Sequence, residues 1–441
     1  MKKGVTQSIT ETRSLLSRRG FLRIGALACA AGPLKVRYAK SDNQAAAKAR
    51  TSSDPEAIAA SLEDNIYTRL LGVRPHLGAH EHISRLSGSR MSEEVMQAMA
   101  EANKFFVDMH ELGAAAGRHI AKIMGAEDAI VTSGGFSAMI LGAAACLTGA
   151  DPEKIEALPQ VTWSRKECLI QTGHRFDYEK AYRMAGMTIV EAKTREEFKR
   201  SMNERTAMVA ALAVVEKQGV FTTPLPLKRS SHPPAEVMMP KELIEVGRKA
   251  GVPVLVDMAS DLPPASNLTR FIQMGADLVV VSGGKAIGGP QSTGILAGRK
   301  DLIEAARIHN SPNENIGRGM KVGKEEIIGL IAALDRYIKI DHDAEIAGWN
   351  AKAKRLAHEL QGIPGLTAEY AMNTMGYADV DLSWDKTIIP LTEEEARKKL
   401  AEGHPRVLYD EAVRTCQLRD GEDVLLARRL REFFKNAARK D

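Results

Sequence analysis

The stretch from Asp277 to Pro290 constrains this chain most, because an apolar strand pattern runs directly into a glycine-rich turn that carries one lysine. Three valines lead into Ser282 and two glycines, and Lys285 follows. A lysine at the end of a buried strand can be desolvated and held rigidly. Under those conditions an amine becomes a nucleophile towards carbonyl groups. Lys285 is therefore the first candidate for a catalytic residue.

A second strand pattern ends on an acidic residue. Residues 253–257 read Pro-Val-Leu-Val-Asp, and Asp257 lies 28 positions before Lys285. That interval accommodates one helix and one strand. A lysine that forms a Schiff base, together with a carboxylate that pairs with a pyridinium nitrogen, is the protein-side signature of pyridoxal 5'-phosphate (PLP) chemistry. The pattern predicts a PLP site, in which Asp257 keeps the ring nitrogen protonated.

Strand and helix patterns alternate along the middle of the chain. This alternation predicts an α/β fold with a mainly parallel, doubly wound sheet. Ligands of such sheets bind at the carboxyl ends of the strands, where Ser133, Asp257 and Lys285 all fall. We expect strands at residues 129–132, 168–171, 188–192, 206–214, 253–257, 277–281 and 294–297, and helices at 91–105, 111–124, 135–147, 177–185, 241–250, 267–274 and 422–438.

A small polar turn follows the first of these strands. Ser133, Gly134 and Gly135 end the strand and open a helix, so their backbone N–H groups can hold the cofactor phosphate at the helix N-terminus. Ser282 is expected to add a hydroxyl group to the same phosphate. The long connection at residues 215–240 is either a cover for this site or an ordinary surface insertion.

Longer strings make the pattern more specific. They are Leu71-Gly-Val-Arg-Pro75, Phe106-Val-Asp-Met-His-Glu-Leu112, Val131-Thr-Ser-Gly134, Gly275-Ala-Asp277, Gly283-Gly-Lys-Ala-Ile-Gly-Gly-Pro-Gln291 and Met320-Lys-Val-Gly-Lys-Glu-Glu326. With them the chain resembles the fold-type-I PLP-dependent enzymes. Within that group it is similar to the family related to selenocysteine synthase (L-seryl-tRNA selenium transferase), and to its D-glucosaminate-6-phosphate ammonia-lyase-like subgroup. The resemblance covers roughly residues 65–360.

The leader motif described below, the polar composition that follows it and the resemblance together predict a domain organisation. We expect an export signal with its flank at residues 1–40, an N-terminal tether and arm at 41–90, a PLP-binding large domain at 91–335 and a smaller α+β domain at 336–441. The resemblance also implies a homodimer or higher homo-oligomer, since fold-type-I sites are usually completed by a neighbouring subunit.

Further site residues follow from the resemblance. His174 falls where this fold places a residue stacked on the pyridine ring, and Arg175 is then a candidate for a substrate or cofactor anion. Arg318 and Lys321 resemble the basic pair that faces the substrate, where cations can clamp a carboxylate or phosphate. The alternatives stay open: a hydrogen-bonded loop histidine for His174, and a plain surface pair for Arg318 and Lys321.

The chain departs from the family pattern at residues 78–82, which read Gly-Ala-His-Glu-His. His80 and His82 would share one face if this segment were a strand. No third metal ligand is evident, so no metal site is predicted. We expect both histidines to contribute acid–base or polar contacts to a substrate, and the departure suggests a substrate that differs from those of the relatives.

The first 40 residues carry most of the net positive charge. They hold nine Lys/Arg and one acidic residue, whereas the rest of the chain holds 52 Lys/Arg against 55 Asp/Glu. Ser17-Arg-Arg-Gly-Phe-Leu-Arg23 followed by a short apolar segment predicts a twin-arginine signal. The expected location is the periplasm or another exported compartment, reached through the twin-arginine machinery. The body has no charge excess that would favour nucleic acid as a partner.

These features predict a PLP-dependent enzyme acting on a small amino acid or amino sugar acid. β-Elimination with release of ammonia, through a Schiff base on Lys285, is the first expectation. Racemisation, epimerisation and aldol cleavage use the same lysine and electron sink. A selenium transferase acting on aminoacyl-tRNA, or an exported protein that kept the fold without catalysis, are the further alternatives.

Overall fold

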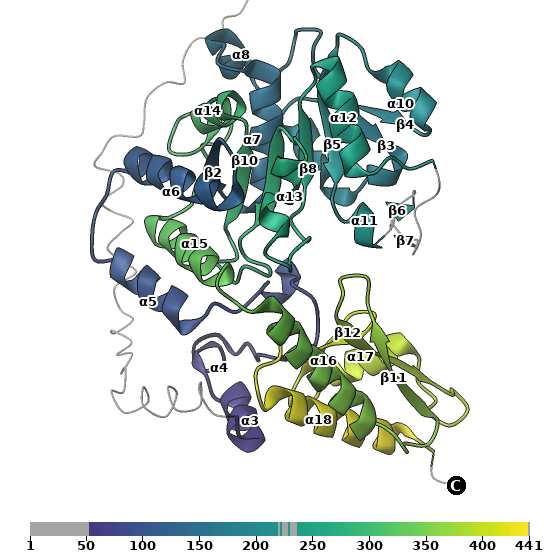
Figure 1. Ribbon diagram of the computed structural model, residues 1–441. Helices are drawn as coiled ribbons and strands as arrows, with labels where there is room; N and C mark the ends of the chain where they lie inside the picture. The colour runs from purple at the N-terminus through teal and green to yellow at the C-terminus, as the bar shows by residue number, and fades with distance from the viewer. Residues whose placement is uncertain (1–52, 219–220, 223–227, 230–235, 440–441) are drawn as a thin grey trace, which may run out of the picture. The chain divides into compact units, whose positions relative to one another are not determined.

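The computed structural model describes residues 53–218, 221–222, 228–229 and 236–439 (Figure 1). The predicted export signal at residues 1–40 lies outside the described residues. So does most of the predicted tether that begins at residue 41.

A seven-stranded sheet forms the centre of the large domain, with the strand order β2-β10-β9-β8-β5-β3-β4. Neighbouring strands are parallel, except that β10 runs antiparallel to both β2 and β9. The predicted mainly parallel α/β sheet is confirmed. The strands are β2 (Asp128–Thr132), β3 (Glu167–Gln171), β4 (Thr188–Ala192), β5 (Thr206–Leu212), β8 (Val254–Asp257), β9 (Leu278–Ser282) and β10 (Gly294–Gly298).

Helices cover both faces of this sheet (Figure 1). Successive side chains of a strand point to opposite faces, so Val254 and Val256 enter one apolar core while Leu255 enters the other. The first core is closed by α5 (Glu93–Ala102), α6 (Met109–Met124), α10 (Arg195–Ser201), α12 (Pro240–Ala250), α13 (Asn267–Gln273) and α15 (Lys324–Tyr337). The second is closed by α7 (Gly134–Thr148), α9 (Lys180–Met184) and α14 (Lys300–His309).

Helix α7, which follows β2, contains no charged residue. It is buried on nearly all sides beneath the sheet, and a helix that is apolar all round belongs in a protein core. Among the residues that the structure describes, no helix has both the length and the apolar character needed to cross a membrane.

The C-terminal segment builds a third core of the predicted α+β kind. An antiparallel sheet with the order β11-β12-β14 packs against two long helices, and Val380, Leu426 and Phe434 are among its buried residues. The elements are α16 (His342–Glu359), β11 (Leu366–Met372), β12 (Ala378–Trp384), α17 (Glu393–Glu402), β13 (Val407–Leu408), β14 (Val413–Arg414) and α18 (Glu422–Ala437).

The N-terminal arm packs into this third core. Ile58 and Leu77 are buried there, and β1 (Leu77–Gly78) pairs in parallel with β13. The remaining short elements are α3 (Pro55–Glu63), α4 (Ile66–Leu71), η1 (Ser84–Leu86), α8 (Pro152–Ala157), η2 (Thr172–His174), η3 (Asp177–Glu179), α11 (Val215–Gln218), β6 (Phe221–Thr222) and β7 (Lys228–Arg229). The rest of the connection at 215–240 lies largely outside the described residues, and its role as a cover stays a prediction.

Candidate active site

The turn after β2 has the geometry of an anion site. Ser133 is the N-cap residue of α7, and its side chain makes no capping hydrogen bond. Gly134 has φ +79°, a left-handed conformation that glycine adopts at little steric cost. The first N–H groups of a helix have no partner within the helix and carry its positive dipole end. This turn can therefore bind a phosphate group.

Gly294 brings the phosphate turn and the lysine strand together. It pairs in register with Thr132 of β2 on one side and with Ser282 of β9 on the other. A Cβ atom at position 294 would lie 2.4 Å from the carbonyl carbon of Gly134, closer than real Cβ contacts. Only glycine lets β10 approach α7 in this way. Ser282 ends β9 half-buried, one strand away from Thr132.

Lys285 follows this strand in a tight glycine turn. A Cβ atom at Gly284 would lie 2.4 Å from Cα of Gln291, so the turn packs closely against the chain that returns to β10. Lys285 Nζ donates a hydrogen bond to Ser260 Oγ at 2.6 Å. The sequence reading missed Ser260. Its position three residues past Asp257, at the carboxyl end of a buried strand, is the signal that could have identified it.

Asp257 ends β8 beside the lysine strand, in register with Val280. Its Oδ1 accepts a hydrogen bond from the Ala259 N–H at 2.9 Å. Burial raises the pKa of Asp257, while the Ala259 N–H and the charge of Lys285 act in the opposite direction. A cationic ring nitrogen beside this carboxyl group would favour its ionised form.

These residues fit a PLP molecule. Gly135 lies close to the loop after β8, because a Cβ atom on it would be 3.6 Å from Ala259 Cβ. The phosphate turn, the acidic residue and the lysine therefore share one edge of the sheet. The turn at Ser133 can hold the phosphate, Asp257 the ring nitrogen and Lys285 the aldehyde carbon.

His174 ends η2, directly after β3, and is enclosed by protein. The Leu212 N–H donates to Nδ1 at 2.9 Å, so the proton is on Nε2, which donates to the Met238 carbonyl at 2.7 Å. The residue is 1% exposed, and burial lowers its pKa to about 4. This position favours the hydrogen-bonded loop histidine over a ring stacked on the cofactor.

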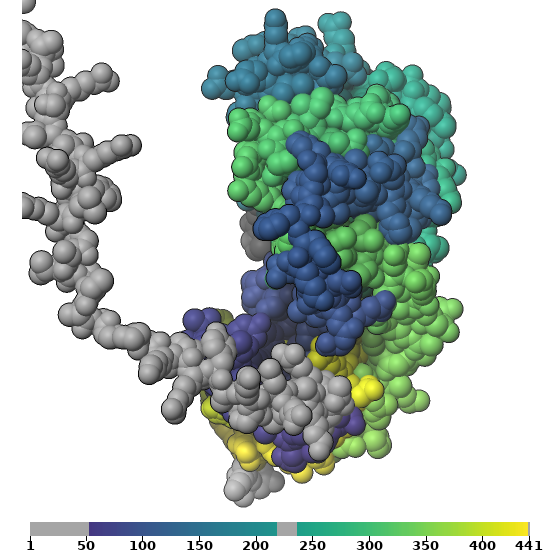
Figure 2. All heavy atoms as spheres, turned by 90° about the vertical axis from the view of Figure 1, so that its left-hand side faces the viewer, coloured from purple at the N-terminus to yellow at the C-terminus, as the bar shows by residue number. Residues whose placement is uncertain are grey.

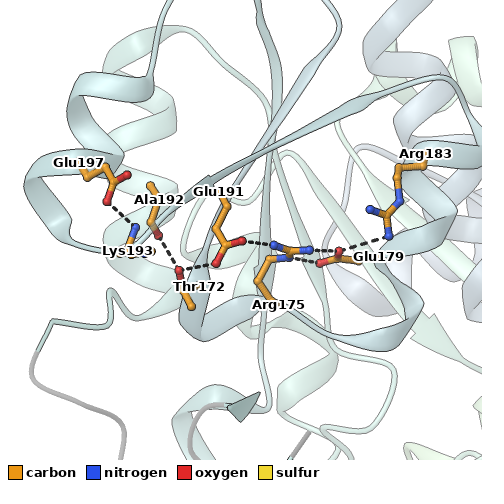
Figure 3. Close-up of polar contacts among 8 residues, drawn as sticks. All are labelled: Thr172, Arg175, Glu179, Arg183, Glu191, Ala192, Lys193 and Glu197. Carbon is orange, nitrogen blue, oxygen red and sulfur yellow. Dashed lines mark hydrogen bonds and ion pairs between the residues drawn. The ribbon is translucent and has the colours of Figure 1, made fainter. Parts of the chain in front are cut away.

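Arg175 is occupied by two carboxylates (Figure 3). Its guanidinium group makes a bidentate contact with Glu179, with both distances 2.5 Å, and a further ion pair with Glu191. Thr172 and Arg183 extend this network at the surface of the sheet. Binding a substrate anion would require Arg175 to leave these partners, so the geometry favours a structural role.

Arg318 and Lys321 line a hollow of about 290 Å³ with His110 and Asn310. Helix α6, which contributes His110 to the lining, is drawn in blue on the side of the molecule that Figure 2 faces. Neither Lys285 nor Asp257 lines this hollow. Within the described chain, the basic pair is therefore not brought into the same pocket as the lysine.

The segment at 80–82 is not a strand. His80 is buried, with Nε2 3.0 Å from Nε2 of His76, and its Nδ1 donates to the Glu81 carbonyl. Glu81 accepts from Tyr377 and pairs with Arg414. In the described part of the chain, no group of three or more metal-ligating side chains is assembled. The motif links the arm to the C-terminal sheet, and its predicted contact with substrate stays a prediction.

The arm also touches the lysine turn. A Cβ atom on Gly88 would lie 2.8 Å from the Gly284 carbonyl oxygen, and Gln291 donates to the Ser84 carbonyl at 2.8 Å. Gln417 donates to the Gly88 carbonyl at 2.8 Å. The arm thus connects the lysine turn with the C-terminal segment.

Comparison with known proteins agrees with this geometry. A model of the L-seryl-tRNA selenium transferase family matches residues 85–363, more than half of the chain. The chain belongs to this family. Relatives and neighbours by structure are PLP-dependent enzymes, so the chain is a PLP-dependent enzyme of fold type I, as the resemblance predicted.

Individual relatives differ in how much of their length is matched. A 5'-C-glycyluridine monooxygenase-decarboxylase of a Streptomyces species is 35% identical over 69% of this chain and 74% of its own. The D-glucosaminate-6-phosphate ammonia lyase of Salmonella typhimurium is 28% identical over 86% of this chain and 100% of its own. An L-seryl-tRNA(Sec) selenium transferase of Serratia proteamaculans matches at 27% over only 51% of its own length.

Solved structures also match the fold of this chain. A D-glucosaminate-6-phosphate ammonia-lyase structure matches with TM-score 0.72 and 25% identity, covering 85% of this chain and 99% of that one. A serine palmitoyltransferase with PLP matches with TM-score 0.51 and 15% identity, which shows the fold alone. The matches to the ammonia lyase, in sequence and in structure, support the predicted lyase over the selenium transferase alternative.

Proposed function

We propose that this protein is a PLP-dependent lyase that acts by β-elimination on a small amino acid or amino sugar acid: the α-proton and the β-substituent leave, and hydrolysis of the resulting enamine by water releases ammonia. The observation that carries the proposal is the gathering of Lys285, Asp257 and the Ser133 turn at one edge of the sheet. The match to an ammonia lyase over that relative's whole length supports the choice of reaction.

Each residue has a defined task in this reaction. The bound cofactor supplies an electron sink for negative charge at the substrate α-carbon. Lys285 holds the cofactor and moves a proton at that carbon. Asp257 keeps a proton on the ring nitrogen, and the N-terminus of α7 fixes the phosphate.

The test is ammonia release by purified protein, with amino sugar acids and with D- and L-amino acids as substrates. The wild-type protein should be yellow, and borohydride should bleach it while attaching the cofactor mass to the peptide that contains Lys285. Lys285→Ala should be colourless and inactive. A colourless wild-type protein that takes up no added PLP would refute the proposal and leave the non-catalytic alternative.

Oxidative decarboxylation is the second candidate, because the 35% identical relative carries that activity in its name. Oxygen uptake with release of carbon dioxide, and no ammonia, would favour it. Racemisation or epimerisation would instead exchange the α-hydrogen with solvent deuterium and form the other stereoisomer, without releasing ammonia. Aldol cleavage would release an aldehyde.

The proposal extends to the location of the protein. The twin-arginine motif at Arg18 and Arg19 supports export in the folded state. Residues 1–40 fused to a reporter should carry it to the periplasm, and Arg18→Lys/Arg19→Lys should retain it in the cytoplasm. Equal export of both fusions would refute this part.

A homodimer or higher homo-oligomer is also proposed. Large apolar side chains are exposed on α4 and before α6, and Phe106 is fully exposed. Apolar patches of this kind mark contact surfaces. Light scattering should give at least twice the monomer mass for the wild-type protein. Leu71→Lys/Phe106→Lys should shift it towards the monomer.

A further inference from the structure

The Lys285 amine has a neutral partner on the neighbouring loop. After β8, the chain runs through Met258 and Ala259 to Ser260, whose Oγ receives the hydrogen bond from Lys285 Nζ at 2.6 Å. A hydroxyl group accepts a hydrogen bond and can donate another. It can therefore orient the amine without adding a charge beside it.

The same loop is held tightly on both sides of Ser260. On one side, the Ala259 N–H is bonded to Asp257. On the other, the Asp261 N–H donates to the Met258 carbonyl at 3.0 Å, and Asn267 donates to the Asp261 carbonyl at 2.7 Å. Ser260 itself is exposed, but the backbone that carries it is fixed.

A buried ion pair completes this support. Asp261 is 1% exposed, and Lys217 Nζ lies 3.0 Å from its Oδ1. Lys217 also donates to the carbonyls of Asp261 and Pro263, at 3.3 and 3.4 Å. A buried carboxylate needs such a partner, because an unpaired one is strongly destabilising. Lys217 thus ties the start of α11 to the loop beneath the Lys285 amine.

Helix α11 is anchored a second time. Glu216, the residue before Lys217, forms an ion pair with Arg270 of α13. Two neighbouring side chains therefore bind α11 to the segment that follows β8. Lys217 cannot shift along the loop without breaking one of these contacts.

We propose that Ser260 is a positioning residue for Lys285, and that the buried Lys217–Asp261 pair acts through the loop to hold Ser260 in place. The inference rests on Lys285 as the residue that binds the cofactor, and not on which reaction follows. The chain's own hydrogen bond pre-orients the amine towards the cofactor before the cofactor arrives.

The experiment measures how fast the full-length, cofactor-free protein captures PLP, followed by absorbance and by borohydride trapping on the Lys285 peptide. Ser260→Ala should slow capture about threefold to tenfold, as expected for losing one hydrogen bond. Ser260→Thr, which keeps the hydroxyl group, should restore it. Ser266→Ala removes an exposed serine from the same connection and should leave the rate unchanged.

The role of the Lys217–Asp261 ion pair is tested by asking whether the effects of the single variants on the rate of PLP capture add in a double variant. Lys217→Met should slow capture to a similar extent, Lys217→Arg should recover it, and the double variant Ser260→Ala/Lys217→Met should be no slower than the slower single variant. Lys249→Met, on the exposed end of α12, is the matched control. If Lys217→Met does not fold, Lys217→Met/Asp261→Asn removes both charges and takes its place in the comparison.

The outcomes separate this inference from the proposed function. Normal capture by Ser260→Ala, no advantage of Thr over Ala, or additive effects of the two sites would overturn the inference while leaving the cofactor assignment intact. Absence of capture by the wild-type protein would overturn both. Loss of capture in Lys285→Ala alone, with Ser260→Ala unaffected, would retain the cofactor site and reject the role of Ser260.

Discussion

At the residue scale, the surroundings of Asp257 affect both the pKa of its carboxyl group and its role beside the cofactor ring. The residue is half-buried, and desolvation raises the pKa of its carboxyl group. A positively charged ring nitrogen beside it would favour the ionised carboxylate, and the carboxylate would in turn keep that nitrogen protonated. We expect Asp257→Asn to lower kcat on the order of 100-fold, a magnitude typical of removing one preorganised electrostatic contact. Steady-state ammonia release measures this.

The control for Asp257→Asn is Asp301→Asn. Asp301 is an exposed carboxylate paired with Arg299 on α14, away from the site. Its loss should change kcat by less than about twofold, since exposed ion pairs contribute little. Equal activity of the two variants would contradict the role given to Asp257.

Buried histidines make stability depend on pH. Burial lowers the pKa of His174 to about 4, against 6.5 for an unperturbed histidine. The unfolded chain therefore binds this proton more readily. The stability contributed by the neutral ring is fully present above pH 6.5 and is lost as pH falls towards 4, by up to about 3 kcal/mol.

Urea unfolding at several pH values between 7 and 4 tests this prediction. His174→Gln should flatten part of the pH dependence, whereas His358→Gln, at an exposed position of α16, should not. His76 and His309 have similarly lowered pKa values, both about 4, so some dependence should persist in His174→Gln. An unchanged slope in that variant would be evidence against the buried neutral ring.

At the scale of elements, the site depends on how closely β10 approaches the start of α7. Gly294→Ala would place a methyl group 2.4 Å from the Gly134 carbonyl carbon, so the strand and the phosphate turn must separate. We expect a loss of about 1–3 kcal/mol of stability, as for overpacking in a core, and at least tenfold weaker PLP binding. Thermal unfolding and PLP titration measure the two effects.

Gly113 provides the matched comparison. It lies within α6, and a Cβ atom there would meet no heavy atom within 4 Å. Gly113→Ala should therefore stabilise the protein by roughly 0.5–1 kcal/mol and leave PLP binding unchanged. If both alanine variants behaved alike, close packing at Gly294 could not be the cause.

At the scale of the whole molecule, one ion pair connects the arm to the C-terminal segment. Arg90 contacts both carboxylate oxygens of Glu422, at 2.6 and 2.8 Å. Burial alone would raise the pKa of Glu422, but Arg90, together with the N–H group and charge of Arg419, lowers it below its ordinary value. This contribution to stability is present above the ordinary glutamate pKa and is lost as pH falls below it.

Arg90→Met should cost about 1–2 kcal/mol at neutral pH. The value is below that of a fully buried pair, because the Arg90 side chain is 44% exposed. Arg85→Met, which removes a more exposed partner of Asp410, should cost less than about 0.5 kcal/mol. Denaturant unfolding at pH 7 compares them, and equal costs would show that the bidentate contact contributes nothing specific.

Local sequence patterns determined the sheet and the chemistry that its edge carries. The apolar strands ending at Asp257 and Ser282, and the Ser133 turn, were identified because strand periodicity, glycine placement and chain order are local properties. Alternation of strands and helices restricts the topology to few choices. Helices 195–201 and 300–309 were not expected, because their apolar faces are short and interrupted by charge.

Only the tertiary structure decided which polar side chains are available at that edge. His174 and Arg175 were predicted to be site residues, yet His174 is hydrogen-bonded to Met238, and Arg175 is paired with Glu179 and Glu191. Ser260 was overlooked, and yet it contacts Lys285. The physical reason is that periodicity reports which residues are buried, whereas a hydrogen bond between residues distant in sequence depends on how the strands are ordered in space.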